Sequence, residues 1–264
     1  MQNISLVAFY GDKPVPLASL IQKLQRCLAN HQLLQDKFIP YQLTQVHGTI
    51  IGCEGCKTDL GVVNQWFKEK RQEIKYIDFA SLINYLQHQV NLSITIRFGG
   101  YDRNTNYNFL SRDQHLYHRS FQLQSADNNI IPVLIGWSWQ DYAVTLAIDN
   151  LRRDLQQFNL LHKYHTNPDD IDNDFYLRLG TINAKLTSAE MQVISTDLRN
   201  CLETQLALYI PITLNDLAFA QYQDLTLTPA TTQIFPVAEI TANQFEQFFI
   251  NLPGCNYRFI CYCL

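Results

Sequence analysis

The strongest constraint on the fold of this chain is an order of elements that occurs twice. Each copy has an apolar strand, a helix whose apolar residues recur every three or four positions, and a short strand containing Gly-Thr-Ile. The copies cover 5–11, 17–28 and 44–52 in the first half, and 130–139, 144–158 and 176–182 in the second. Such spacings are typical of amphipathic helices and of strands. The pattern therefore predicts a duplicated α+β protein.

The repeat also predicts how the chain is divided. We expect a first lobe at 1–125, a second lobe at 126–228 and a strand–helix–strand extension at 229–264. Each lobe would be a βαβαβ-type unit with an antiparallel sheet, and the two duplicated lobes would surround a central cleft. An α+β fold of this kind accounts for the length without a long structureless linker.

Composition and charge narrow the possible partners. The 264 residues are 47% hydrophobic and carry a net charge of −4, with a pI near 5.9. This balance excludes a bulk nucleic-acid-binding surface, so a nucleotide or RNA end would have to be bound in a local cleft. No cationic leader precedes an apolar run, and no apolar run approaches the length of a membrane span. We expect a soluble, cytoplasmic protein with no membrane partner.

Seven cysteines in a chain of this size do not suggest a disulfide framework. Cys53 and Cys56 form a Cys-x-x-Cys, but they lack the nearby second pair that usually completes a zinc site. A redox pair normally opens a helix, and the residues after Cys56 are poor helix formers. We therefore expect free thiols in a loop, with no metal centre and no cofactor.

The two Gly-Thr-Ile strands present polar residues at alternating positions. His47 and Thr49 are two residues apart, so they share one face of the first strand. Leu179, Thr181 and Asn183 share one face of the second strand for the same reason. If a pseudo-twofold axis relates the lobes, the two strands can lie side by side and turn these faces into one cleft.

Two imidazoles in such a cleft would suit the cleavage of a phosphodiester. A neutral imidazole takes a proton from the attacking hydroxyl or water, and a protonated one gives a proton to the leaving oxygen. Threonine hydroxyls donate to the non-bridging oxygens as negative charge builds there. This chemistry needs no metal. We therefore assign His47, Thr49 and Thr181 as the catalytic candidates.

At these residues the chain resembles the two-histidine phosphoesterase superfamily, the LigT-like RNA 2′,3′-cyclic phosphodiesterases and their relatives. The resemblance rests on Val46-His47-Gly48-Thr49-Ile50 and on Leu179-Gly180-Thr181-Ile182, and it covers most of residues 4–228 in the order of elements. It implies metal-independent hydrolysis of a 2′,3′-cyclic phosphate or a related RNA end.

One position departs from the pattern of that family. Its second histidine would fall where this chain has Leu179, which cannot exchange a proton, and losing such a partner typically costs about 10²–10⁴ in rate. His118-x-Ser120 is an alternative second motif, and His162 and His165 could fold over the cleft. Either another group supplies the proton, or the chain binds a nucleotide, an RNA end or a protein partner without turnover.

Substrate-binding residues are expected among aromatic and cationic side chains. The candidate stacking platforms for a base are Tyr10, Tyr101 and Trp137. Arg97 and Arg178 are candidate phosphate clamps, although Arg178 alternates away from the face of Thr181. Asn183 lies on that face and is assigned to substrate binding.

Overall fold

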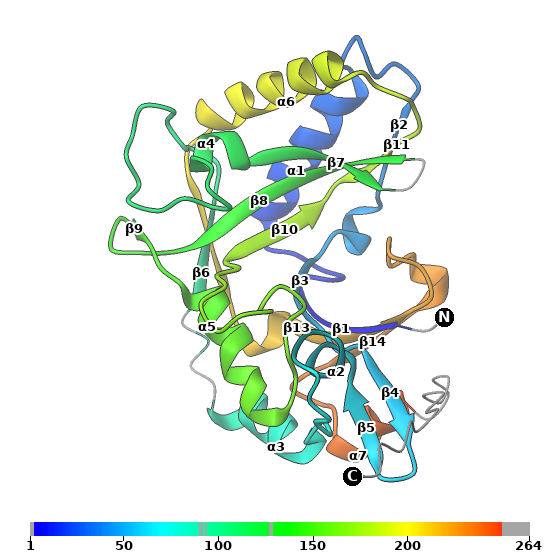
Figure 1. Cartoon of the computed structure of the whole chain (residues 1–264). Helices are drawn as coiled ribbons and strands as arrows, with labels where there is room; N and C mark the ends of the chain where they lie inside the picture. The colour runs from blue at the N-terminus through cyan, green and yellow to red at the C-terminus, as the bar shows by residue number, and fades with distance from the viewer. Residues whose placement is uncertain (1–2, 90–91, 93, 127–128, 250–264) are drawn as a thin grey trace.

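The computed structural model describes residues 3–89, 92, 94–126 and 129–249 (Figure 1). Its strands are β1 Asn3–Ala8, β2 Phe38–Pro40, β3 Gly48–Gly52, β4 Gly55–Thr58, β5 Gly61–Asn64, β6 Ile94–Phe98, β7 Phe121–Ala126, β8 Asn129–Gln140, β9 Ala143–Val144, β10 Asp174–Arg178, β11 Gly180–Ile182, β12 Leu208–Ile212, β13 Leu217–Tyr222 and β14 Thr232–Pro236. Its α-helices are α1 Val15–Ala29, α2 Gln65–Arg71, α3 Phe79–Asn84, α4 Leu116–Arg119, α5 Ala147–Asp154, α6 Ser188–Glu203 and α7 Ala242–Gln247. The predicted α+β class is confirmed.

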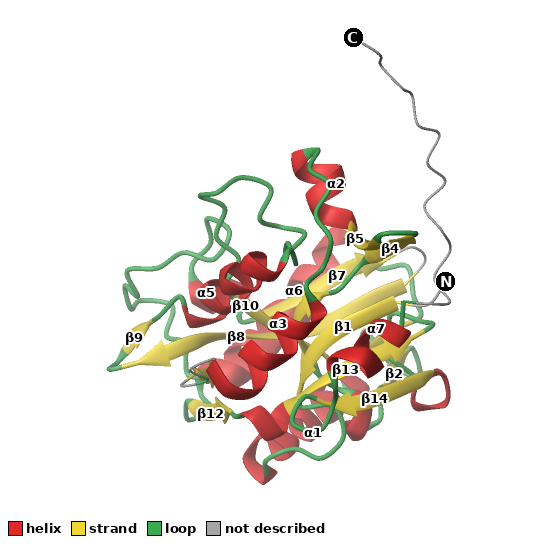
Figure 2. Cartoon of the chain, turned by 90° about the horizontal axis from the view of Figure 1, so that it is seen from below, coloured by secondary structure: helices red, strands yellow, loops and turns green. Residues whose placement is uncertain are grey.

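Twelve of the described strands form one sheet. Its main path has the order β12-β6-β8-β10-β3-β1-β13-β14, while β2, β7, β9 and β11 pair beside this path. The paired strands run antiparallel. Strands β4 and β5 form a separate hairpin. Figure 2 shows the helices packed around this curved sheet.

The sheet crosses the boundary that we expected between residues 125 and 126. Strand β6 precedes this boundary but pairs with β8 and β12, which follow it. Strand β13 follows the boundary but pairs with β1. Strand β14 continues the sheet from β13, and the last strand expected in 229–264 lies outside the described residues. The segments 1–125 and 126–228 therefore do not each form a sheet of their own.

Local sequence signals correctly located two of the longer helices. The stripe predicted for α1 is buried and consists of Leu17, Leu20, Ile21, Leu24 and Leu28. Helix α6 begins with the predicted capping box, in which the Thr187 hydroxyl accepts from the Glu190 backbone and the Glu190 carboxylate accepts from the Thr187 backbone. Helices α1 and α6 pack together at one end of the molecule, and α3 and α7 pack together at the other (Figure 1).

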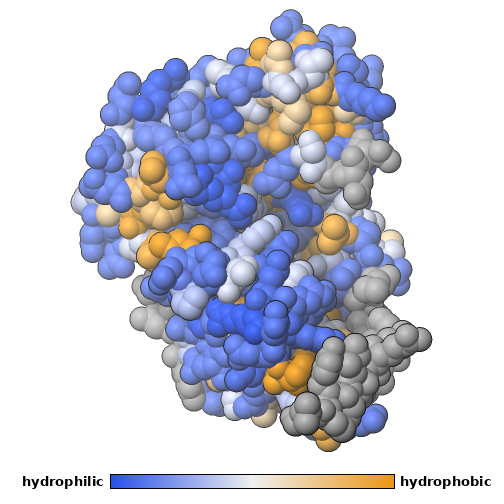
Figure 3. Space-filling model, viewed as in Figure 1, coloured by the Kyte–Doolittle hydropathy of each residue, from blue (hydrophilic) through white to orange (hydrophobic). Residues whose placement is uncertain are grey.

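The core and the surface separate as expected for a globular chain. The largest cluster of buried apolar side chains includes Phe175, Leu177 and Leu179 from the region of β10. In the view of Figure 3 the surface is mostly hydrophilic, with separate hydrophobic patches. None of the described helices is long and apolar enough to cross a membrane.

Strands β3 and β10 meet at a point of close packing. They pair through Gly48 and Leu177. A Cβ atom added to Gly48 would lie 2.0 Å from Cζ of Phe175, whose ring is fully buried. Glycine is therefore needed at position 48 because the ring of Phe175 passes directly over the strand.

A buried arginine links the same two strands. Arg152 of α5 is 2% exposed, and its guanidinium donates to the carbonyl oxygens of Ile50 at 2.7 Å and of Thr49 at 3.2 Å. It also donates to the carbonyl oxygens of Asp172 at 2.6 Å and of Asp174 at 3.1 Å. Arg152 thus fastens β3 to the segment of chain that enters β10.

We expect Gly48→Ala to lower the free energy of unfolding by about 1–3 kcal/mol, the usual cost of overpacking a core. The cause is the collision of the new methyl group with the ring of Phe175. Urea denaturation measures the effect, and the double variant Gly48→Ala/Phe175→Leu should lose less than the sum of the two single variants. Strictly additive losses would contradict the direct contact.

Candidate functional site

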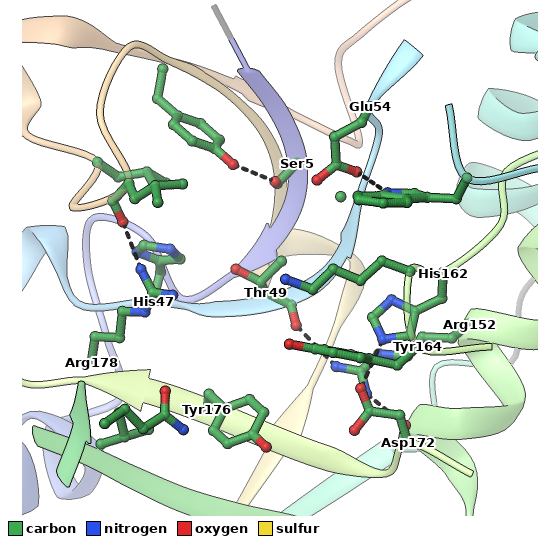
Figure 4. A pocket seen from close by; sticks show the side chains of 18 of the residues that line it. Ser5, His47, Thr49, Glu54, Arg152, His162, Tyr164, Asp172, Tyr176 and Arg178 are labelled. Carbon is green, nitrogen blue, oxygen red and sulfur yellow. Dashed lines mark hydrogen bonds and ion pairs between the residues drawn. The ribbon is translucent and has the colours of Figure 1, made fainter. Parts of the chain in front are cut away.

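A pocket of about 200 Å³ lies beside the junction of β3 and β10 (Figure 4). Strands β1, β3, β10 and β13 contribute to its lining, together with α2, the segment before α4 and the loop between α5 and β10. Its charged, aromatic and hydroxyl-bearing residues include His47, Thr49, Glu54, Trp66, Arg112, Arg152, His162, Lys163, Tyr164, Asp172, Tyr176 and Arg178.

His47 is the residue before β3 and is 8% exposed. Its Nδ1 lies 2.8 Å from the carbonyl oxygen of Gln45, and this nitrogen carries the proton because a carbonyl can only accept. The Nε2 of the neutral ring is then an acceptor. Burial lowers the pKa of His47 to about 4, the carbonyl opposes this shift, and the charges of Arg178 and Lys13 reinforce it. At neutral pH His47 is therefore a base.

Facing side chains of the two strands line the pocket together. Thr49 lies in the pocket with His47, as the alternation along β3 predicted. Because Leu177 is paired with Gly48, His47-Gly48-Thr49 runs antiparallel to Tyr176-Leu177-Arg178. Tyr176 and Arg178 both line the pocket, whereas Leu177 is buried in the core. The pocket face of β10 therefore carries a tyrosine and an arginine.

Tyr176 and Arg178 are held by different partners. The Tyr176 hydroxyl donates to Asp174 at 2.7 Å and accepts from Arg119 at 2.9 Å. Burial and the charge of Asp174 raise the pKa of Tyr176, so its hydroxyl stays protonated. Arg178 donates from Nη1 to the carbonyl oxygen of Leu225 at 3.0 Å. Arg178 can contribute positive charge to the pocket, while the Tyr176 proton is already engaged.

The second Gly-Thr-Ile strand lies outside the pocket. Leu179 is fully buried in the hydrophobic core. The Thr181 hydroxyl donates to the hydroxyl of Tyr41 at 3.2 Å, and Asn183 is exposed. These positions leave the pocket because β10 ends before Leu179 and β11 pairs with β2. The prediction that Leu179, Thr181 and Asn183 face one cleft with His47 is therefore corrected.

Two of the expected substrate-binding residues, Arg97 and Tyr101, contact other side chains of the protein instead of the pocket. The guanidinium carbon of Arg97 is 4.6 Å from the ring centre of Tyr101 and 4.2 Å from that of Trp139. The buried Tyr101 hydroxyl donates to the Arg97 carbonyl oxygen at 2.7 Å. Tyr10 instead lies beside the pocket, with its ring centre 5.9 Å from that of His47. Arg97 and Tyr101 thus belong to an aromatic cluster, while the ring of Tyr10 packs against the imidazole of His47.

The remaining candidates from the sequence also lie elsewhere. His118 is exposed on α4, and the hydroxyl of Ser120 donates to the carbonyl oxygen of Tyr117 at 2.8 Å. Trp137 is fully buried, and its indole nitrogen donates to Asp174 at 2.6 Å. His118-x-Ser120 is therefore not the second motif of this pocket, and Trp137 offers no face to a base.

Several pocket residues were not anticipated from the sequence. Tyr164 is 44% exposed, and the charges of Lys163 and Arg112 each lie 4.8 Å from its ring centre. Trp66 donates from its indole nitrogen to Glu54 at 2.8 Å. Cations beside aromatic rings suit a ligand that combines a phosphate with a nucleobase, because the cations attract the phosphate and the rings can stack on the nucleobase. The signal in the sequence is the run His-Lys-Tyr-His at 162–165, which places a cation and an aromatic ring between two histidines.

His162 provides a second buried imidazole in the pocket. Its Nε2 lies 2.8 Å from Oδ2 of Asp172. Burial lowers the pKa of His162 to about 4; the charge of Arg152 acts in the same direction, and Asp172 opposes it. Burial raises the pKa of Asp172, but the hydrogen bond from His162 and the charge of Arg152 outweigh it and hold that pKa well below its usual range. His162 is therefore neutral at pH 7, as His47 is.

The two cysteines of the Cys-x-x-Cys segment are in different chemical states. Cys53 is buried as a free thiol, and burial raises its pKa. Cys56 is disulfide-bonded, which corrects the expectation of free thiols at both positions. Across the described part of the chain, no group of three or more His, Cys, Asp or Glu side chains is placed to hold a metal ion.

Comparisons with known proteins give little guidance. No protein-family model and no curated protein matches the chain. A solved structure, TT0787 of Thermus thermophilus, superposes with a TM-score of 0.41 and 12% sequence identity, covering 89% of this chain and 98% of that chain. Similarity at this level assigns neither a fold family nor a function.

We expect stability to fall as the pH drops from about 6.5 towards 4. The unfolded chain takes up protons on its histidines near pH 6.5, whereas folded His47 and His162 stay neutral down to about pH 4. In His47→Gln, the dependence of the unfolding free energy on pH should decrease in this window by up to about 1.4 kcal/mol per pH unit. Urea denaturation between pH 4.5 and 7.5 tests this, and equal slopes in both proteins would contradict it.

Proposed function

We propose that this chain hydrolyses a phosphodiester without a metal ion, at a 2′,3′-cyclic phosphate or a related RNA end, as a divergent relative of the two-histidine phosphoesterases. The observation that carries the proposal is His47, a neutral imidazole with an acceptor nitrogen, beside Thr49 in the pocket. This is the form that can take a proton from water. Lys163 and Arg178 add positive charge for the phosphate, and Arg112 lies beside them in ion pairs with Asp172 at 3.5 Å and Asp174 at 3.6 Å.

We also propose that the fold consists of two duplicated lobes. The order of strands along the main path of the sheet supports this proposal. Counting outwards from the central β10–β3 pair, β8 occupies the same place on one side as β1 on the other, β6 the same place as β13, and β12 the same place as β14. A twofold axis between Leu177 and Gly48 would map His47-Gly48-Thr49 onto Tyr176-Leu177-Arg178. The second motif is then Tyr-x-Arg, three residues before Leu-Gly-Thr, and the two lobes exchange strands β6 and β13.

The proposed reaction uses the pocket residues in distinct roles. His47 takes a proton from a water molecule as its oxygen attacks phosphorus. Thr49 donates to a non-bridging oxygen, and Arg178 compensates the negative charge that builds there. The bond to the ribose oxygen breaks, and this oxygen needs a proton. Tyr176 is poorly suited to supply it, because its hydroxyl already donates to Asp174.

Binding of a nucleotide or an RNA end without turnover is the second candidate function. It is favoured by Leu179, which lies in the core, and by the pocket face of β10, which carries Tyr176 where the proposed duplication would call for a histidine. Trp66 and Tyr164 would contribute aromatic surface for a base. A scaffold that only binds a protein partner is less well supported, because it predicts a cleft filled by apolar side chains.

We expect His47→Gln to lower kcat/KM on a nucleoside 2′,3′-cyclic phosphate by about 10²–10⁴, because the variant lacks the base. His88→Gln, at an exposed histidine outside the pocket, is the control and should retain wild-type turnover. Turnover should also persist in the presence of a chelator. Unchanged turnover in His47→Gln, or loss with the chelator and recovery with a divalent cation, would contradict the proposal. Wild-type binding without turnover would favour the second candidate.

A further inference from the structure

Two histidine–aspartate pairs anchor the loop between residues 158 and 174. The Nε2 atom of His162 lies 2.8 Å from Asp172, and that of His165 lies 2.8 Å from Asp149. All four side chains are buried, and the two imidazole rings are 5.1 Å apart. Of the two histidines, His162 lines the pocket and His165 does not. The loop therefore contains two similar pairs with different access to a ligand.

The pairs also differ at the second ring nitrogen. His165 Nδ1 lies 3.4 Å from the side-chain nitrogen of Gln156, so both of its nitrogens have partners. His162 Nδ1 is buried and has no hydrogen-bond partner within the described chain. Because Nε2 of His162 donates to a carboxylate, Nδ1 of the neutral ring is an acceptor. A buried acceptor without a protein partner is uncommon in folded proteins, and a donor group on a bound ligand would satisfy it.

We propose that His162, held by Asp172, is the second proton-transfer residue of this pocket, in place of a histidine on the second motif strand. This inference rests on the proposed function, because it requires a phosphodiester in the pocket. In Figure 4, His47 and His162 lie on either side of Thr49. In-line displacement at phosphorus places the attacking and leaving oxygens on opposite sides, so a base and an acid are needed on opposite sides as well.

The charges around the two imidazoles assign their roles. His47 lies near Arg178, whose charge disfavours an imidazolium. His162 contacts the carboxylate of Asp172 at 2.8 Å, which favours an imidazolium, whereas burial and the charge of Arg152 disfavour it. A bound phosphodiester adds a negative charge and raises the pKa of both rings. The ring that contacts a carboxylate takes up the proton, so His162 is the acid and His47 the base.

The proton transfers balance with this assignment. The oxygen of water forms a bond to phosphorus, and its proton passes to Nε2 of His47. The bond between phosphorus and a ribose oxygen breaks, its electron pair stays on that oxygen, and the oxygen receives a proton from Nδ1 of His162. The product is a phosphomonoester with a free ribose hydroxyl. Exchange with solvent then removes the proton from His47 and returns one to His162.

The test compares His162→Gln with His165→Gln, a matched control at the neighbouring pair outside the pocket. One substrate is a nucleoside 2′,3′-cyclic phosphate, whose leaving ribose oxygen needs a proton. The other is a deoxynucleoside 3′-(4-nitrophenyl) phosphate, whose nitrophenolate leaves without one. We expect His162→Gln to lower kcat/KM by about 10²–10⁴ on the first substrate and by less than about tenfold on the second. His165→Gln should keep the wild-type ratio of the two values.

This ratio does not depend on the fraction of enzyme that is folded, so a destabilised variant still gives a result. Equal losses on both substrates in His162→Gln would overturn the role of His162 as the acid. If wild-type turnover depends on His47 but His162→Gln keeps the wild-type ratio, only this inference fails. If the wild type shows no turnover that depends on His47, the proposed function fails and the inference fails with it.

Discussion

The guanidinium of Arg152 is the interaction on which the pocket depends. In the described sheet, β3 and β10 are paired through Gly48 and Leu177 alone, so the junction needs a further link. Arg152 supplies it through hydrogen bonds to carbonyl groups on both sides. Its charge is tolerated in the interior because these bonds, and the Asp172 carboxylate at 3.5 Å, replace water. Since Asp172 also binds His162, one buried charge supports both the strand junction and a pocket histidine.

Burial is the largest influence on the pKa of each pocket imidazole. His47 and His162 are both neutral at pH 7, so the positive charge of the pocket comes from its lysine and arginines: Lys163, Arg178, the buried Arg152, and Arg112, which is ion-paired with Asp172 and Asp174. An anion entering the pocket would be attracted by these cations and would in turn favour protonation of the imidazoles beside it. Ligand binding and proton uptake are therefore coupled in this arrangement.

The sequence predicted what depends on neighbouring residues. The apolar stripe of α1, the capping box of α6 and the common face of His47 and Thr49 follow from local spacing, and the structure has all three. What local spacing could not fix was which face meets the pocket. The matching residues Gly-Thr-Ile suggested that Gly48 is equivalent to Gly180. In the structure Gly48 is paired with Leu177, three residues earlier, and lies under the ring of Phe175.

The pocket collects its groups from segments that are far apart in the chain, which is why the sequence motif indicated only part of it. The residue before β3 is the basic imidazole His47, β10 contributes the charge of Arg178, and the loop between residues 158 and 174 contributes the imidazole of His162. In the proposed duplication, the two motif segments therefore carry different groups: His47 and Thr49 on one, Tyr176 and Arg178 on the other. The pairing of a sheet fixes the direction of each side chain, so a histidine missing from β10 can be replaced only by an element that reaches the same space. A loop anchored by two buried histidine–aspartate pairs has the necessary rigidity. The absence of a second strand histidine is thus compatible with a complete acid–base pair.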